Sequence, residues 1–367
     1  MDFTNKTINF LILHSGLQRF SADIYNTFGS IYLLDLGISF PIIVLIHVGN
    51  CILRSILRPL SLLLSEKIGL KRALIVGVFI GSGLFLVILK INGVNSWLYF
   101  YILYLSLCDI TYCLPYHSYF AVAGNKNSRG KQVGTKLGFA TIFRTIAPLA
   151  GGIIITHYGF LALYLTSMVI MLLSAFPLFY AKNIEPGEKM NFKQALKAID
   201  KQGMILKIGD GILFVHSFVW VISLFYLVGD YVTYGRLVTF ELLATVLLSF
   251  LLGYLIDKGD GKNISIIGLI LTAVVIILRA FVVTTVMGII ITDILMAFGT
   301  IFYISSFEVG FYNIAKESKN TLWFNFFGEL GWDIGASVSL ALIAGLFILG
   351  VPLQFLIVFS LPGLFLI

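Results

Sequence analysis

The sequence predicts an all-α membrane protein, and three observations support that prediction. Of its 367 residues, 59% are hydrophobic and only 12% are charged, which is about half the charged share of a typical soluble protein. Apolar runs of roughly 20 residues, enough for a helix to cross the hydrocarbon core, recur along the whole chain. The basic residues gather in alternate connecting segments. A soluble fold of this composition would have a mostly apolar exterior, and the hydrophobic content excludes disorder.

Polar breaks divide the chain into twelve apolar segments, each expected to form one membrane-spanning helix. The expected spans are 6–34, 38–63, 73–91, 96–122, 135–156, 160–181, 207–229, 236–256, 264–282, 286–311, 321–347 and 350–367. The longest polar interval, 182–206, separates six spans from six, so we expect an N-terminal bundle over 1–181 and a C-terminal bundle over 207–367. Within that interval, NFKQALKAIDKQ is either a short amphipathic helix at the membrane surface or a solvated linker.

The distribution of basic residues predicts the orientation. With both termini in the cytoplasm, 18 of the 25 Lys and Arg residues lie in cytoplasmic segments, and only Lys90 and Arg236 lie on the opposite side. The remaining five are arginines inside spans. This asymmetry follows the positive-inside rule, and we expect a multi-pass protein of the cell (plasma or inner) membrane. Topology thereby accounts for the net charge of +7, and no basic face remains for nucleic acid.

The sequence carries no recognisable enzyme, cofactor or metal pattern. Cys51, Cys108 and Cys113 all lie in apolar stretches without metal-ligand spacing, so they are expected to pack as small hydrophobic residues. No Walker loop, G-x-S-x-G or H-E-x-x-H pattern is present. We therefore expect no enzymatic activity, no cofactor and no resident metal ion.

The loops after the second and eighth spans share one pattern, in which an acid and a lysine directly follow an apolar helix. They read LLLSEKIGLKRAL from Leu62 and GYLIDKGDGK from Gly253, and their acids, Glu66 and Asp257, are 191 residues apart. Each loop occupies the same place in its half of the chain. The spacing therefore predicts an internal repeat of half the protein's length.

Together with the twelve spans and the long central loop, these two loops resemble the G-x-L-x-D-R-x-G-R-K loop of the major facilitator superfamily. The matching residues are Leu64, Glu66, Lys67, Gly69 and Lys71 in the first half, where Leu62 replaces the leading Gly, and Gly253, Leu255, Asp257, Lys258 and Lys262 in the second. The resemblance covers essentially the whole chain. It implies the MFS fold, in which two six-helix bundles are related by a pseudo-two-fold axis, and a secondary transporter that works by rocker-switch alternating access.

The fifth span is similar to a pattern of the family's proton-linked drug antiporters, G-x8-G-x3-G-P-x2-G-G. The matching residues are Gly134, Pro148, Gly151 and Gly152. Phe143 and Ala147 depart from this pattern, and the fourth span has Asp109 but lacks the arginine that many such antiporters carry. The alternative interpretation is close helix packing, because small residues let membrane helices approach one another.

Ionisable residues inside spans are costly, so they mark candidate sites. In the first span, spacings of three and four place five polar residues on one helical face, namely Ser15, Arg19, Asp23, Asn26 and Ser30. Arg19 and Asp23 are expected to neutralise each other. The resemblance implies that this span lines the central cavity, where the stripe is a substrate or proton site. The alternative is a structural ion pair.

Asn50 in the second span, Asp109 in the fourth and Arg144 in the fifth complete the predicted cavity set. The guanidinium of Arg144 suits recognition of a carboxylate or phosphate, and a structural bond to Asp109 is the alternative. His14, His117 and His216 lack ligand spacing.

The second and eleventh spans carry opposite charges at matched depths, and the resemblance implies that these spans meet across the two halves. Arg58 and Glu329 both lie roughly 9–12 Å from the cytoplasmic ends of their helices, and Arg54 and Asp333 lie about 15–18 Å deep. We expect an interdomain gate of salt bridges that closes the cytoplasmic side. The alternative is that each charge extends separately toward the headgroups.

Taken together, these features predict a proton-coupled secondary transporter for a small solute, acting in the lipid bilayer as a monomer. An exporter of amphiphilic or drug-like compounds fits the fifth-span pattern, and an importer or exchanger of a small organic anion fits the in-span arginines. A lipid scramblase is the alternative of a different class.

Overall fold

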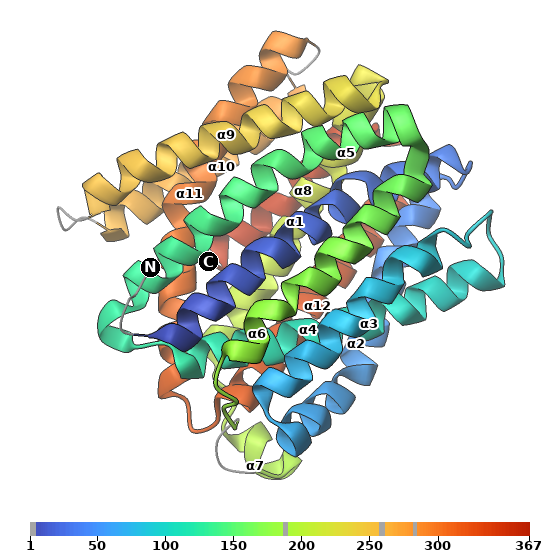
Figure 1. The fold of residues 1–367 in the computed structure, drawn as a ribbon. Helices are drawn as coiled ribbons and strands as arrows, with labels where there is room; N and C mark the ends of the chain where they lie inside the picture. Colours follow the sequence, from blue (N-terminus) through green and yellow to red (C-terminus); the bar gives the residue numbers. More distant parts are fainter. Residues whose placement is uncertain (1–4, 186–189, 257–260, 282–284) are drawn as a thin grey trace.

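The computed structural model describes residues 5–185, 190–256, 261–281 and 285–367. Every regular element in these ranges is a helix, and together they form one bundle (Figure 1). The long helices are α1 (Lys6–Asp35), α2 (Phe40–Ile68), α3 (Leu70–Ile88), α4 (Ser96–Ala123), α5 (Arg129–Ser174), α8 (Lys201–Val228), α9 (Tyr231–Ile256), α10 (Gly261–Phe281), α11 (Val286–Glu317) and α12 (Thr321–Ile348). The short ones are the 3-10 helix η1 (Lys126–Ser128), α6 (Phe176–Tyr180), α7 (Phe192–Lys197) and the 3-10 helix η2 (Leu353–Phe365).

Helix α5 contains the fifth and sixth expected spans. Its backbone leaves helical geometry at Gly159, where φ is 77°, and the ribbon doubles back there (Figure 1). Glycine adopts this left-handed conformation without steric cost. The expected division into two spans therefore lies within one continuous element, and α6 continues the second arm after Ala175.

The last expected span, 350–367, differs from the α-helix that its composition suggests. Residues Leu353–Phe365 form the 3-10 helix η2, preceded by Pro352 and interrupted by Pro362. Proline lacks the amide hydrogen that a helix interior needs, but α2, α4 and α5 stay α-helical around Pro59, Pro115 and Pro148, so Pro362 alone does not account for the 3-10 geometry. At about 2.0 Å per residue, its 13 residues extend roughly 26 Å, close to the thickness of the hydrocarbon core.

The outer surface of the bundle is apolar. Seven of the helices in the described ranges are long and apolar enough to cross a membrane. Large hydrophobic side chains lie exposed along them, including Ile56 at 65% and Val338 at 65%. Such a surface requires lipid around it.

We use "first half" for α1–α6, "second half" for α8–η2, and "linker" for residues 181–200 between them. The end of the bundle that carries the linker is called the linker end, and the opposite end is called the far end. The α2–α3 corner lies at the linker end, where the Leu70 amide donates to the Ile184 carbonyl. The start of α1 also lies there, because Asn5 donates to the Ala123 carbonyl at the end of α4.

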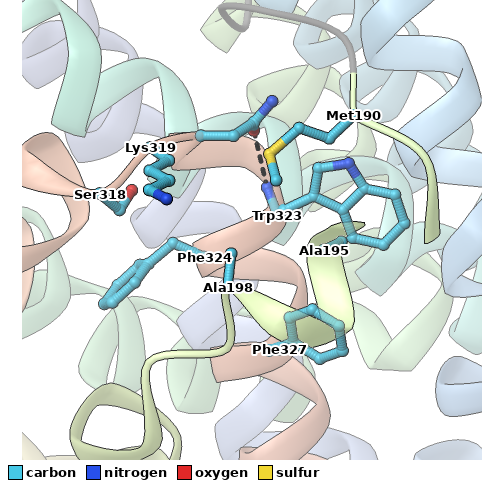
Figure 2. Close-up of a pocket in the computed structure, with 9 residues that line it drawn as sticks. Met190, Ala195, Ala198, Ser318, Lys319, Trp323, Phe324 and Phe327 are labelled. Carbon is cyan, nitrogen blue, oxygen red and sulfur yellow. Dashed lines mark hydrogen bonds between the residues drawn. The ribbon is translucent and has the colours of Figure 1, made fainter. Parts of the chain in front are cut away.

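The linker contains a short helix, α7, whose N-terminus is capped reciprocally by Asn191 and Gln194. Of the two sequence interpretations, the structure therefore shows the helix. Figure 2 shows the part of the linker with Ala195 beside Trp323 and Phe327 of α12. The cavity at this contact is about 20 Å³, room for one water molecule, so it is not a solute site.

The two halves pack closely at the far end through α5 and α9. A Cβ atom built on Gly235 would lie 2.5 Å from the Pro148 carbonyl oxygen, and one built on Gly152 would lie 2.4 Å from the Tyr231 carbonyl oxygen. Real Cβ atoms do not approach backbone this closely. Only glycine permits this contact between helices, as is common in membrane bundles.

Replacing Gly235 with alanine should lower the melting temperature of the purified protein, because the new methyl group forces α5 and α9 apart at a cost of about 1–3 kcal/mol. Gly138→Ala on α5 is the matched control, since nothing lies within 4 Å of its Cβ position and alanine favours a helix by about 1 kcal/mol over glycine. Thermal unfolding followed by tryptophan fluorescence should rank G138A at or above wild type and G235A below it. Equal melting temperatures for the two variants would contradict this packing.

Candidate functional site

An ion pair joins α1 and α5 near the middle of the bundle. Asp23 Oδ2 lies 2.9 Å from Arg144 Nε, and the Arg144 side chain is 44% exposed although it lies deep in α5. The sequence suggested other pairings, namely Arg19 with Asp23 and Arg144 with Asp109. The structure places Asp23 in direct contact with Arg144, which replaces the suggested contact of Arg144 with Asp109, while Arg19 stays within electrostatic range of Asp23.

Arg19 lies at mid-depth within electrostatic range of Asp23, but the two side chains do not form a direct ion pair. Among the described residues, no carboxylate oxygen lies within 4 Å of its guanidinium, and its side chain is exposed. It lies within electrostatic range of Tyr112 and Tyr116 on α4 and of Tyr312 on α11. The exposed guanidinium thus lies between helices of both halves. Asn26 on α1 is likewise exposed.

Asn50 and Asp109 belong to a different group from Arg19 and Arg144. Asn50 Nδ2 donates to Asp109 Oδ2 at 2.9 Å, and Arg54 Nη1 donates to the same oxygen at 3.0 Å. Ser106 donates to Asn50 Oδ1 at 2.8 Å. These two predicted cavity residues thus hold Arg54 in position, and only Asp109 retains partial exposure.

The charged residues of α2 and α12 meet across the halves. Arg54 Nε donates to Asp333 Oδ1 at 2.7 Å, while Arg58 Nη2 hydrogen-bonds to Asp333 Oδ2. Arg58 Nη1 also lies 3.8 Å from Glu329 Oε2. Arg58 and Asp333 are each only 1% exposed. One carboxylate thus receives two arginines, whereas the matched depths suggested two separate pairs.

Further contacts close the linker end. Lys136 on α5 lies 2.7 Å from Glu308 on α11, and His117 Nδ1 lies 2.7 Å from the Tyr312 hydroxyl oxygen. Lys316 also donates to the Gly124 carbonyl. Sequence reasoning missed these pairs, because it treated Lys136 only as a topology signal. No sequence pattern showed that α11 would lie against α4 and α5.

Contacts also close the far end, and they are mainly aromatic. Phe28 packs edge-on against Tyr234 with ring centroids 5.8 Å apart, and Phe40 lies 4.8 Å from Phe347. The Tyr231 hydroxyl hydrogen-bonds to Asp35. The described residues therefore connect the halves at both ends of the bundle, with the Arg19 region between them.

The structure describes the first of the two repeated loops completely and the second only in part. Gly69 caps α2 with φ 82°, and its backbone continues directly into α3. Lys71 Nζ donates to the Ala181 carbonyl at 2.9 Å, which ties this corner to the start of the linker. Glu66 and Lys67 occupy the last turn of α2. In the second half, Gly253 lies within α9, and Asp257 and Lys258 lie outside the described residues.

The described residues hold no group of three or more histidine, cysteine or acidic side chains arranged for a metal ion. Cys51 and Cys108 are buried, and all three cysteines are free.

Comparison with known proteins identifies the fold. The model of the Major Facilitator Superfamily matches residues 11–240. The chain belongs to this superfamily. Its all-α structure is the MFS fold, and membership makes it a membrane transporter by family and architecture. A search of curated proteins finds no match.

Solved MFS structures align with the chain over almost its full length. FucP in the outward conformation, described elsewhere as the E. coli fucose:proton symporter, aligns with a TM-score of 0.70 at 14% identity, over 99% of this chain and 97% of that one. The POT family transporter PepTSo gives a TM-score of 0.74 at 10% identity, over 98% and 96%. The human organic anion transporter MFSD10 gives 0.63 at 10% identity, over 98% of both chains. These likenesses establish the fold alone.

Asp333→Asn should loosen the linker end, because both arginines then lose their charged acceptor. Cys113 is a native reporter, since it lies partly exposed on α4 within electrostatic range of Arg54 and Glu329. With Cys51 and Cys108 replaced by alanine, Cys113 should react with a small maleimide on the order of tenfold faster in D333N, as expected for the loss of about 1.5–3 kcal/mol of charged hydrogen bonding.

Asp200→Asn is the control for this measurement, since Asp200 only caps the start of α8. It should leave the labelling rate at the wild-type value. Equal rates in D333N and wild type would show that Asp333 does not keep the linker end closed.

Proposed function

We propose that the protein is a secondary active transporter for a small organic anion, which it binds between its two halves and carries by alternating access. The single observation behind the choice of solute is Arg19. A cation in the middle of a membrane-spanning helix is costly, and here it is exposed, with Asp23 within electrostatic range but no carboxylate oxygen of the described residues within 4 Å. Such a group suits an anion that enters from water.

The charge of the proposed site supports the same solute class. Arg19 and Arg144 contribute two positive charges, and Asp23 contributes one negative charge, so the site carries a net charge of +1. A monoanion would neutralise it. Guanidinium groups bind carboxylates and phosphates through paired, charge-assisted hydrogen bonds. Asp23 fixes Arg144, while Arg19 and the exposed part of Arg144 remain available to the solute.

The transport cycle requires the two ends to open in turn. Buried ion pairs of α2 with α12 and of α5 with α11 hold the linker end, whereas glycine and aromatic contacts hold the far end. A buried ion pair adds little net stability over water-exposed charges. We propose that the bundles 1–181 and 207–367 move as bodies about the Arg19 site, breaking one set of contacts while forming the other.

The fifth-span pattern no longer favours a drug exporter. A Cβ atom on Gly151 would lie 2.5 Å from Phe28, and one on Gly152 would lie 2.4 Å from the Tyr231 carbonyl. Close packing therefore accounts for both glycines. A scramblase has no supporting observation among the described contacts.

We also propose that protons drive transport and that the linker end faces the cytoplasm, as the basic residues of its loops favour. A monomer in the plasma or inner membrane suffices for this cycle, because the Arg19 site is built from one chain.

The solute class can be tested with Arg19→Gln. A thermal-shift screen of carboxylates, phosphate esters and uncharged analogues should find stabilisation by anions only. The variant should bind the best anion about 10–100-fold more weakly, since a charged hydrogen bond contributes about 1.5–3 kcal/mol, and R19K should recover part of the loss.

Lys90→Gln, which removes an exposed cation at the far end, should bind the anion as the wild type does. Stabilisation by uncharged compounds that persists in R19Q would refute the assignment of an anion to this site.

A further inference from the structure

A second buried charge cluster lies wholly within the second half. Arg279 on α10 is 2% exposed, and its Nη2 donates to Asp293 on α11 and to Glu241 Oε1 on α9, the latter at 3.4 Å. Its Nη1 lies 3.0 Å from His216 Nε2 on α8, and its Cζ lies 3.9 Å from the centre of the Trp220 ring. Four helices thus converge on one guanidinium.

The protonation state of His216 follows from this geometry. A guanidinium can only donate hydrogen bonds, so His216 Nε2 must accept, which requires the neutral imidazole. His216 therefore adds no positive charge. Among the described residues, Tyr234 on α9 is a further titratable group near the cluster, with its phenol within electrostatic range of Glu241.

The charges in the cluster do not balance. Among the described residues, two carboxylates face one arginine, namely buried Asp293 and Glu241, whose side chain is 22% exposed, so the cluster carries a net charge of −1 when both are ionised. Asp293 is fully buried, and its Oδ2 makes no hydrogen bond of good geometry among the described residues, although the Trp220 indole N–H lies near this carboxylate. An unsatisfied carboxylate oxygen in a buried, unbalanced cluster is costly. One proton on Oδ2 removes the excess charge.

An outer cavity touches this cluster through Arg279 and Trp220. A cavity of about 360 Å³ is lined by Arg279, Trp220, Ser223 and Gln354, and also by Phe40 and Phe347. It is large enough for several water molecules. Phe40 belongs to the first half and Arg279 to the second, so relative movement of the halves changes the shape of the cavity.

We propose that Asp293 and Glu241 share one exchangeable proton beside Arg279 and that this proton is the one coupled to transport. The cluster is neutral with the proton bound and carries a charge of −1 without it. The site is separate from the solute site, where Asp23 has Arg144 as its own partner. This inference rests on the proposed transport function and identifies which carboxylates carry its coupling proton.

Infrared spectroscopy of the full chain in phosphatidylcholine vesicles tests the proposal with the proton as the only ligand. Lowering the pH should produce the carbonyl stretch of a buried carboxylic acid. Asp293→Asn and Glu241→Gln should each lose or shift this band. Asp23→Asn and the exposed linker variant Glu185→Gln should keep it. Absence of the band, or a band that survives both D293N and E241Q, would overturn the proposal.

The coupling of protonation to movement of the halves can be measured on the same proteins. Spin labels are placed at Lys131 and Lys319, two exposed linker-end positions in opposite halves. The distance distribution should change with pH in wild type and E185Q, and it should be independent of pH in D293N and E241Q. A pH response that persists in both variants would overturn the coupling role. Neither readout involves the solute, so failure of anion binding at Arg19 is seen separately.

Discussion

The architecture depends on the neutralisation of charges that are buried between the two halves. Asp333 of α12 receives both Arg54 and Arg58 of α2, and all three side chains are buried. Arg58 and Asp333 depend on partners from the opposite half to stay in a low-dielectric interior, whereas Arg54 also has Asp109 of its own half. The ion pairs align the two halves. The contact is also reversible, because water can replace the charged partners if the halves separate.

The two ends of the bundle use different chemistry for the same task. The linker end closes through ion pairs, such as Lys136 with Glu308, whereas the far end closes through apolar contacts, such as Gly235 against Pro148. Arg19 lies between them, with no carboxylate oxygen of the described residues within 4 Å. In the proposed cycle, a bound anion changes the charge at this centre and protonation changes it near Arg279. The solute and the proton would then act on separate parts of the structure.

The sequence predicted those features that follow from a stretch of chain by itself, without knowledge of its neighbours in space. Apolar length predicted the spans, and the paired loops with Glu66 and Asp257 indicated the superfamily. Sequence reasoning failed where the outcome depends on which helices are neighbours. Asp23 has two arginines within reach along the chain and in space, and only the packing of α1 on α5 selects Arg144. Glu241 attracted no attention, because its partners are on other helices and no spacing relates them.

The central claim is that the two ends open in turn around the Arg19 site. Electron–electron distance measurements on one preparation test it most directly, with one spin-label pair at Lys131 and Lys319 of the linker end and another at Asn92 and Leu349 of the far end, all four positions being exposed. Conditions that lengthen one distance should shorten the other. Two distances that stay fixed, or that lengthen together, would contradict alternating access in this protein.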